Sequence, residues 1–123
     1  MHYNMTGSGE KAIVFIHGFG GWGGLWQWQV EHFKSQAKVI TVDLPGHGQT
    51  PWVPSGLLDM ADGLRQVLDR ENISRAHWVA SSFGGLLALM LLETSPDRAA
   101  TLSLIGAPPR FSAALSKFLR RLC

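Results

Sequence analysis

Hydrophobic residues in this chain gather in short continuous runs, and segments with a helical repeat separate these runs. The runs are rich in β-branched and aromatic residues and are bounded by turn-forming residues, a pattern typical of strands buried on both faces. We therefore expect four strands, at residues 12–17, 38–43, 76–81 and 101–105. No strand is expected before residue 12, where the chain enters a Gly/Ser loop.

Between the runs, the spacing of apolar residues changes to that of amphipathic helices. The segment from Trp22 to Phe33 carries an apolar residue every three or four positions, which places them on one helical face. A second helix is expected from Pro54 to about Asn72, because Pro-Ser is a helix start signal and an apolar face follows it. Residues 83–93 predict a helix that is apolar nearly all round, and a final helix is expected from Ser112 onwards.

Strands that alternate with helices at this spacing form βαβ crossovers, which build a mostly parallel sheet with helices on both faces. The predicted fold class is therefore α/β, in a three-layer αβα arrangement. No repeat and no linker divides the sequence, so residues 1–123 are expected to belong to one domain.

Charge and hydropathy exclude two classes of partner. The net charge is +2, and the eleven Lys and Arg residues are scattered except for a small cluster at Arg110, Lys117, Arg120 and Arg121. Without a basic stripe, no nucleic-acid partner is expected. Residues 76–92 carry no charge, but this stretch is shorter than the ~20 residues of a membrane span and is interrupted by Ser-Ser and Gly-Gly, so no membrane partner is expected.

The only cysteine is Cys123, so no intrachain disulfide is possible and nothing indicates an oxidising compartment. The first residues lack the charged-then-apolar order of a signal peptide. We therefore expect a cytoplasmic protein, with no metal and no other cofactor.

Unusual residues follow three of the four predicted strands. These segments are His17-Gly18-Phe19-Gly20, Asp43-Leu44-Pro45-Gly46 and Ser81-Ser82-Phe83-Gly84. The carboxyl ends of parallel strands meet at one edge of the sheet, where α/β proteins bind their ligands. The three segments are therefore expected to form one site.

Ser82 has the surroundings of a nucleophile elbow, the sharp strand-to-helix turn of pattern G-x-S-x-G that exposes a serine hydroxyl above the sheet. The residues two before and two after that serine must be small because strand and helix nearly touch there, and in this chain they are Ala80 and Gly84. Centring the turn on Ser81 would put bulky side chains at those positions. Ser82 is therefore the candidate nucleophile, and a simple helix N-cap is the alternative role for it.

A serine nucleophile also needs two backbone N–H groups to stabilise the developing oxyanion. The helix that begins at Phe83 offers one free N–H at its positive end. The loop after the first strand offers a second, most directly that of Phe19, with His17 and Gly18 as supporting residues. Among the five tryptophans, Trp22 is expected to line an acyl site.

These motifs resemble the N-terminal half of the α/β-hydrolases. Within that superfamily the chain is most similar to the pimeloyl-acyl-carrier-protein methyl ester esterases (carboxylesterases) of biotin synthesis, in the stretches Gly84–Leu86, Thr94–Arg98 and Pro109–Ala113. The resemblance implies a serine carboxylic ester hydrolase with Ser82 as the nucleophile and with Phe19 and Phe83 at the oxyanion and acyl-contact positions. It also implies an ester substrate, either a small molecule or one bound to an acyl carrier.

A serine hydrolase needs a histidine base that is oriented by an acid, and in this fold both follow the serine in the chain. No histidine follows Ser82, and the only later acids are Glu93 and Asp97. The five histidines before it each have a structural explanation: His2, His17, His32, His47 and His77. We therefore expect a hydrolase fragment that lacks the family's later strands, cap, acid and histidine. In such a fragment the strand at 101–105 is an exposed edge, open to self-association.

Two alternatives remain open. The segment from Gly18 to Gly23 satisfies G-x-G-x-x-G between a strand and a helix, and Asp43 ends the next strand as a ribose-binding acid would, so the chain could be a dinucleotide-binding Rossmann-type domain. The other alternative is a catalytically dead, hydrolase-like fragment.

Overall fold

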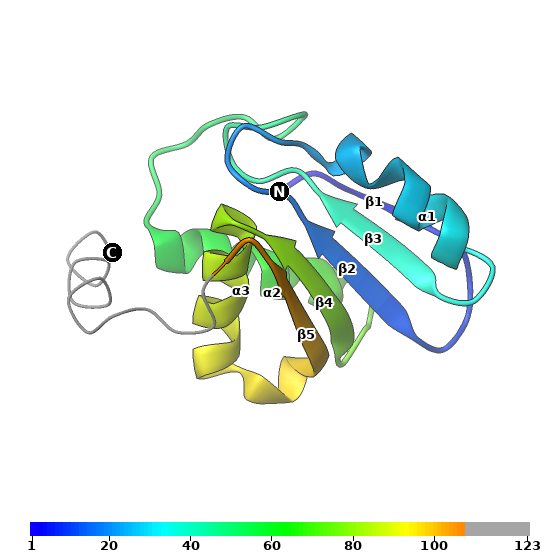
Figure 1. Cartoon of the computed structure of the whole chain (residues 1–123). Coiled ribbons are helices and arrows are strands. Elements are labelled where there is room, and N and C mark those ends of the chain that lie inside the picture. The colour runs from blue at the N-terminus through cyan, green and yellow to red at the C-terminus, as the bar shows by residue number, and fades with distance from the viewer. Residues whose placement is uncertain (108–123) are drawn as a thin grey trace.

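The computed structural model describes residues 1–107, which fold around a single five-stranded sheet (Figure 1). The elements are β1 (Tyr3–Thr6), β2 (Ala12–Ile16), a 3₁₀ turn (Gly23–Trp26), α1 (Gln27–Phe33), β3 (Lys38–Val42), α2 (Leu57–Arg70), β4 (Ala76–Ser81), α3 (Phe83–Thr94), a second 3₁₀ turn (Pro96–Arg98) and β5 (Ala99–Ile105). The order in the sheet is β1-β3-β2-β4-β5, and the last four of these are parallel. The four predicted strands are confirmed. The expected final helix and the basic cluster lie outside the described residues.

The prediction that no strand precedes residue 12 is wrong. Strand β1 pairs antiparallel with β3, from Tyr3 opposite Val42 to Thr6 opposite Val39. The Tyr3 hydroxyl also donates to Glu71 Oε1 at 2.7 Å, which ties the strand to the residue after α2. Because β1 is polar and mostly exposed, it has no hydrophobic run and depends on pairing with distant residues.

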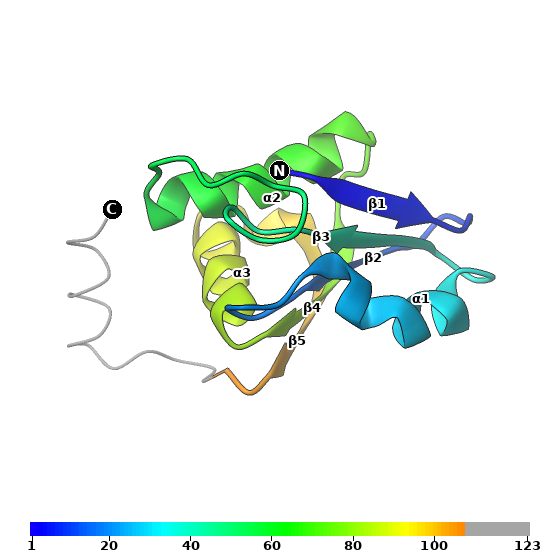
Figure 2. The same ribbon diagram turned by 90° about the horizontal axis from the view of Figure 1, so that it is seen from above.

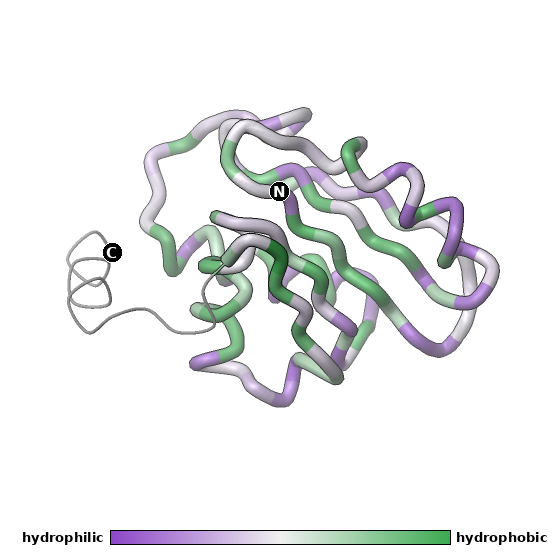
Figure 3. The backbone as a smooth tube through the Cα atoms, in the orientation of Figure 1, coloured by the Kyte–Doolittle hydropathy of each residue, from purple (hydrophilic) through white to green (hydrophobic). Residues whose placement is uncertain are grey.

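Helices cover both faces of the sheet, as predicted: α2 and α3 lie on one face and α1 lies on the other (Figure 2). The side chains of β2 divide between the two layers, because successive residues of a strand point to opposite faces. Val14 and Ile16 belong to the larger core that α2 and α3 complete, while Phe15 packs with Trp26 in a smaller core near α1. The central strands are correspondingly hydrophobic along most of their length (Figure 3).

Two helices begin later than predicted. The segment after Trp22 first forms the 3₁₀ turn, and the α-helix begins only at Gln27, since consecutive glycines are poor helix formers. Helix α2 begins after Gly56, whose N–H donates to Asp59 Oδ2 at 3.1 Å. None of the helices in residues 1–107 combines the length and hydrophobicity needed to cross a membrane.

Strand β5 forms one border of the sheet, and within residues 1–107 no strand pairs with its outer side. Thr101, Ser103 and Ile105 are exposed. This border fits the expected exposed edge, and self-association through it stays a prediction.

Candidate active site

The centre of the sheet carries a topological switch point between β2 and β4. After β2 the chain passes to α1 on one face, and after β4 it passes to α3 on the other face (Figures 1 and 2). Doubly wound sheets bind ligands at such points, outside the carboxyl ends of the strands. The loop that follows His17 and the turn at Ser82 both lie there.

Ser82 adopts a backbone conformation that few residues other than glycine tolerate, with φ 47° and ψ −115°. Such a conformation costs on the order of 1–3 kcal/mol and persists only where the surroundings impose it. Here the Ser82 N–H donates to the carbonyl oxygen of Ile105 at 2.9 Å. Ser82 is exposed, and its side chain makes no capping hydrogen bond. Ser82 thus occupies the N-cap position of α3 without capping the helix through its side chain, and the turn has the strained form of a nucleophile elbow.

Two glycines allow the backbones around this turn to approach closely. A Cβ on Gly84 would lie 2.5 Å from the carbonyl oxygen of His17, and a Cβ on Gly18 would lie 3.2 Å from Ser82 Cβ. Ala80, the departure from the G-x-S-x-G pattern, is fully buried and packs its methyl group into the larger core. The loop after β2 therefore lies against the serine turn.

Two backbone N–H groups near the serine have no acceptor within the described residues. At the start of α3, Gly85 and Leu86 donate to the Ser82 carbonyl, which leaves the Phe83 amide free. In the opposite loop, Gly20 donates to His47 Nε2, while the Phe19 amide has no partner. The amides of Phe19 and Phe83 are the two that were predicted from the sequence to be oxyanion donors.

The buried residue His17 is committed to structure. Its Nε2 accepts the Leu44 N–H at 3.0 Å, and its Nδ1 lies 2.7 Å from the carbonyl oxygen of Gly18. A carbonyl can only accept, so Nδ1 carries the proton and the ring is neutral. Both nitrogens are engaged, and His17 is therefore unable to act as a base toward Ser82.

Burial lowers the pKa of the His17 imidazole, because desolvation disfavours the charged ring. The Gly18 carbonyl acts in the opposite direction and offsets this effect only in part. The neighbouring His47 lowers the pKa further, and Asp43 raises it. The folded chain therefore favours the neutral ring that accepts the Leu44 N–H.

This pKa shift predicts that the chain loses stability in acid. The folded-state pKa lies below the ordinary value of about 6.5, so the stabilisation from His17 is complete above about pH 6.5 and is lost as the pH falls toward the folded-state pKa. Urea unfolding at about pH 7.5 and about pH 5.5 measures this loss. In His17→Asn, the difference between the two pH values is expected to shrink, and an equal difference in variant and wild type would contradict the assignment.

Asp43 fixes the neighbouring loops from a buried position at the end of β3. Its Oδ1 accepts the Gly23 N–H at 2.7 Å, and its Oδ2 accepts the Gln49 N–H at 2.9 Å. Asp43 is buried, and both of its carboxylate oxygens already accept backbone N–H groups, which argues against the ribose contact that the dinucleotide-binding alternative requires.

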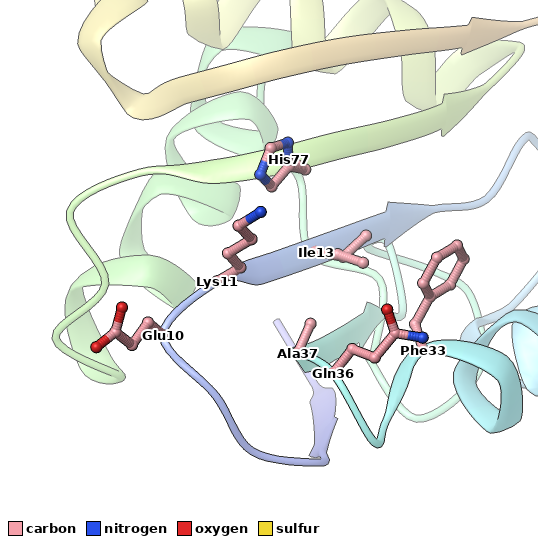
Figure 4. A pocket seen from close by; sticks show the side chains of 7 residues that line it. All are labelled: Glu10, Lys11, Ile13, Phe33, Gln36, Ala37 and His77. Atoms are coloured by element: carbon pink, nitrogen blue, oxygen red, sulfur yellow. The ribbon is translucent and has the colours of Figure 1, made fainter.

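His77 also lies apart from the serine. His77 is at the start of β4, the opposite end from Ser82, and its Nδ1 lies 2.9 Å from Thr101 Oγ1. His77 lines a cavity of about 510 Å³ together with Lys11 and Phe33, and Figure 4 shows these side chains. Within residues 1–107, none of the five histidines is hydrogen-bonded to the Ser82 hydroxyl.

A second cavity, of about 310 Å³, lies beside the serine turn and is mostly apolar. It is lined by Phe19, Pro45, His47, Trp52, Ser55, Leu57, Met60 and Phe83. The contribution of α2 to this cavity was not predicted, because Leu57 and Met60 fit a core-facing helical stripe. The sequence does contain one signal for this cavity, which is the aromatic residue Trp52 in a short loop flanked by prolines.

Trp22, which was expected to line an acyl site, is not among the described residues that line the cavity beside the serine turn. Trp22 lines a different cavity, of about 400 Å³, together with Asn4 of β1 and Trp28 of α1. Among the described residues, no three His, Cys, Asp or Glu side chains come together in a group that could hold a metal ion.

Comparison with known proteins agrees with this geometry. A family model described as the alpha/beta hydrolase fold matches residues 11–122. This chain therefore belongs to the α/β-hydrolase family.

Its relatives include several enzymes that act on esters or lactones, to judge from their names. The pimeloyl-[acyl-carrier protein] methyl ester esterase of Aliivibrio salmonicida is 36% identical over 113 residues, which are 92% of this chain and 42% of that protein. A 3-oxoadipate enol-lactonase of Acinetobacter baylyi is 42% identical over 81 residues, or 65% of this chain and 30% of that protein. The solved structure of a thermophilic esterase from Thermogutta terrifontis has a TM-score of 0.83 and 27% identity, covering 98% of this chain and 45% of its own. The chain thus spans less than half the length of these relatives.

Proposed function

We propose that this chain carries the nucleophile and oxyanion half of a serine ester hydrolase, with Ser82 as the nucleophile. The observation that supports this most directly is the strained turn, which exposes Ser82 beside two free amides, those of Phe19 and Phe83. A structural role needs neither the strain nor the free amides. The chain is, on this proposal, the N-terminal part of one α/β-hydrolase domain.

The reaction begins when Ser82 Oγ attacks the carbonyl carbon of the ester. The Oγ–H proton passes to a base, and the carbonyl oxygen becomes an oxyanion that accepts the N–H groups of Phe19 and Phe83. Collapse of the tetrahedral intermediate breaks the bond to the leaving alkoxide, which takes a proton, and water then hydrolyses the acyl-enzyme. Each of the two amides contributes about 10²–10³ in rate if it behaves as other oxyanion donors do.

The base is the part of this machinery that residues 1–107 do not offer. His17 and His47 accept backbone N–H groups through Nε2, and His77 lies at the far end of β4. We propose that the base and its acid partner come from a polypeptide segment outside these 123 residues, in keeping with the greater length of the relatives. Without that segment, turnover by this chain is expected to be slow.

The acyl part of the substrate is proposed to be apolar. The cavity beside the serine is formed mainly by aromatic and aliphatic side chains, including Trp52, Met60 and Phe83, and none of the described residues that line it is charged. Burial against such a surface contributes roughly 0.8 kcal/mol for each CH₂ group. An acyl-carrier-bound methyl ester, as in the name of the Aliivibrio relative, fits this description, as does a small apolar ester.

Chemical rescue by imidazole tests the proposal. Free imidazole can serve as the missing base, so reaction with a fluorophosphonate is expected to be slow in buffer and to accelerate in proportion to the imidazole concentration. Peptide mass spectrometry is expected to place the adduct on Ser82. Ser82→Ala is expected to abolish labelling, and Ser81→Ala, a change of the same size one residue earlier, is expected to retain it.

Two results would contradict this proposal. Adduct formation that persists in Ser82→Ala would show that another residue reacts. No adduct at any imidazole concentration, in a chain that circular dichroism shows to be folded, would favour the catalytically dead alternative.

A further inference from the structure

The loop that carries the Phe19 amide is held by a side chain from another part of the sheet. Gly20, the next residue, donates its N–H to His47 Nε2 at 3.0 Å. His47 belongs to the loop after β3, twenty-seven residues further along the chain. This bond joins the carboxyl ends of two neighbouring strands.

The hydrogen bond requires His47 to be neutral. Nε2 can accept a hydrogen bond only when it carries no proton. The other nitrogen, Nδ1, lies 3.1 Å from the carbonyl oxygen of Pro45, an acceptor, so Nδ1 carries the hydrogen. A second proton on the ring would set an N–H donor against the Gly20 N–H and would break the contact.

The groups around His47 hold its ring in place without giving it a counter-charge. The Phe19 ring meets it edge-on, with centroids 5.4 Å apart, and the His17 ring lies 5.1 Å away. His17 is neutral and engaged, and the Asp43 carboxylate is occupied by two backbone amides. No ion pair involves His47 within the described residues, and the rest of the cavity lining carries no titratable side chain.

We propose that His47 is the positioning residue of the oxyanion loop: in its neutral form it holds Gly20, and thereby sets the direction of the Phe19 amide toward Ser82. Gly18 packs so closely on Ser82 that a shift of the loop changes the distance between the serine and the Phe19 N–H. Protonation of His47 releases the loop, so acid disables the oxyanion site while leaving the serine turn intact. The catalytic consequence rests on the proposed function, but the hydrogen bond and its release can be tested without turnover.

Nuclear magnetic resonance of the ¹⁵N-labelled chain supplies this test. The ring nitrogens of His47 and the amides of Phe19 and Gly20 are followed from about pH 8 to about pH 5. The two amides are expected to shift with the same midpoint as the His47 ring. Amides of Gly20 and Phe19 that do not follow the His47 titration would overturn the proposal.

Three variants separate the hydrogen bond from ring packing. His47→Phe keeps an aromatic ring beside Phe19 but removes the acceptor, so hydrogen exchange at Gly20 is expected to accelerate roughly two- to tenfold. His47→Gln keeps an acceptor oxygen and removes the titration, so its Gly20 amide is expected to stay protected and independent of pH. His77→Gln is the control at the far end of the sheet and is expected to leave the Gly20 amide as it is in wild type.

Unchanged exchange at Gly20 in His47→Phe would show that His47 only packs against the loop. The wild-type titration needs no variant, so the proposal stays falsifiable if His47→Phe does not fold. The titration of the Gly20 and Phe19 amides can be repeated in Ser82→Ala, because it does not require a serine nucleophile. Failure of the positioning role can therefore be distinguished from failure of the esterase proposal.

Discussion

Replacing Gly84 with alanine is expected to destabilise the folded chain by about 3 kcal/mol, the upper end of the usual cost of overpacking. The new Cβ would lie 2.5 Å from the His17 carbonyl oxygen and 2.7 Å from a methyl carbon of Ile16. The nearest of these atoms belongs to the backbone, so no side-chain rotation can relieve the clash. Helix α3 would have to move away from β2.

Gly63→Ala is the matched control for this change. Gly63 also lies in a helix, but its added Cβ would meet only the terminal methyl of Met1, at 3.0 Å. That flexible side chain can move aside, so this substitution is expected to be neutral or to stabilise by about 0.5–1 kcal/mol, the helix propensity gained from alanine. Urea unfolding followed by circular dichroism measures both variants. Equal stability of the two variants would contradict the close approach at Gly84.

Replacing Asp43 with alanine is expected to cost about 3–6 kcal/mol, because two hydrogen bonds to a charged acceptor are lost at about 1.5–3 kcal/mol each. The N–H groups of Gly23 and Gln49 would then lack their carboxylate acceptor. Asp43→Asn keeps one acceptor oxygen and presents an NH₂ group to the other amide. Its loss is expected to fall between those of wild type and Asp43→Ala.

A partly exposed aspartate provides the comparison. Asp62 pairs with Arg65 at 2.7 Å on the surface of α2, and such surface pairs contribute about 0–1 kcal/mol. Asp62→Ala is therefore expected to lower the free energy of unfolding by no more than about 1 kcal/mol. Thermal and urea unfolding of both alanine variants measure the difference. A similar small loss in Asp43→Ala would show that the Asp43 carboxylate is not needed to hold its two loops.

The parallel strands and the serine turn could be predicted because each has a local cause. Buried parallel strands must be hydrophobic on both faces, so residues 12–16 and 76–81 stand out in any window of the sequence. Small residues flank Ser82 because two backbones meet there. Ligands bind at the carboxyl ends of parallel strands, and this rule predicts that Phe19 and Ser82 lie at one edge of the sheet.

The features that escaped prediction depend on residues far apart in the chain. Strand β1 is polar and exists through its pairing with β3. Trp22 fits a helical stripe by spacing, yet the glycines after it delay the helix and leave its side chain in another cavity. The hydrogen bond from Gly20 to His47 joins two loops, and the periodicity of hydrophobic residues in the sequence does not predict such a contact.

The main-chain bond from the Ser82 N–H to the Ile105 carbonyl ties the serine turn to the border strand. Peripheral strands fray more readily than the interior of a sheet, at a small fraction of the free energy of global unfolding. Peeling of β5 would therefore release the backbone of residue 82 from its strained geometry while the interior remained packed. A thermal melt reports on unfolding of the interior, so it would overestimate the temperature up to which Ser82 keeps its strained backbone conformation.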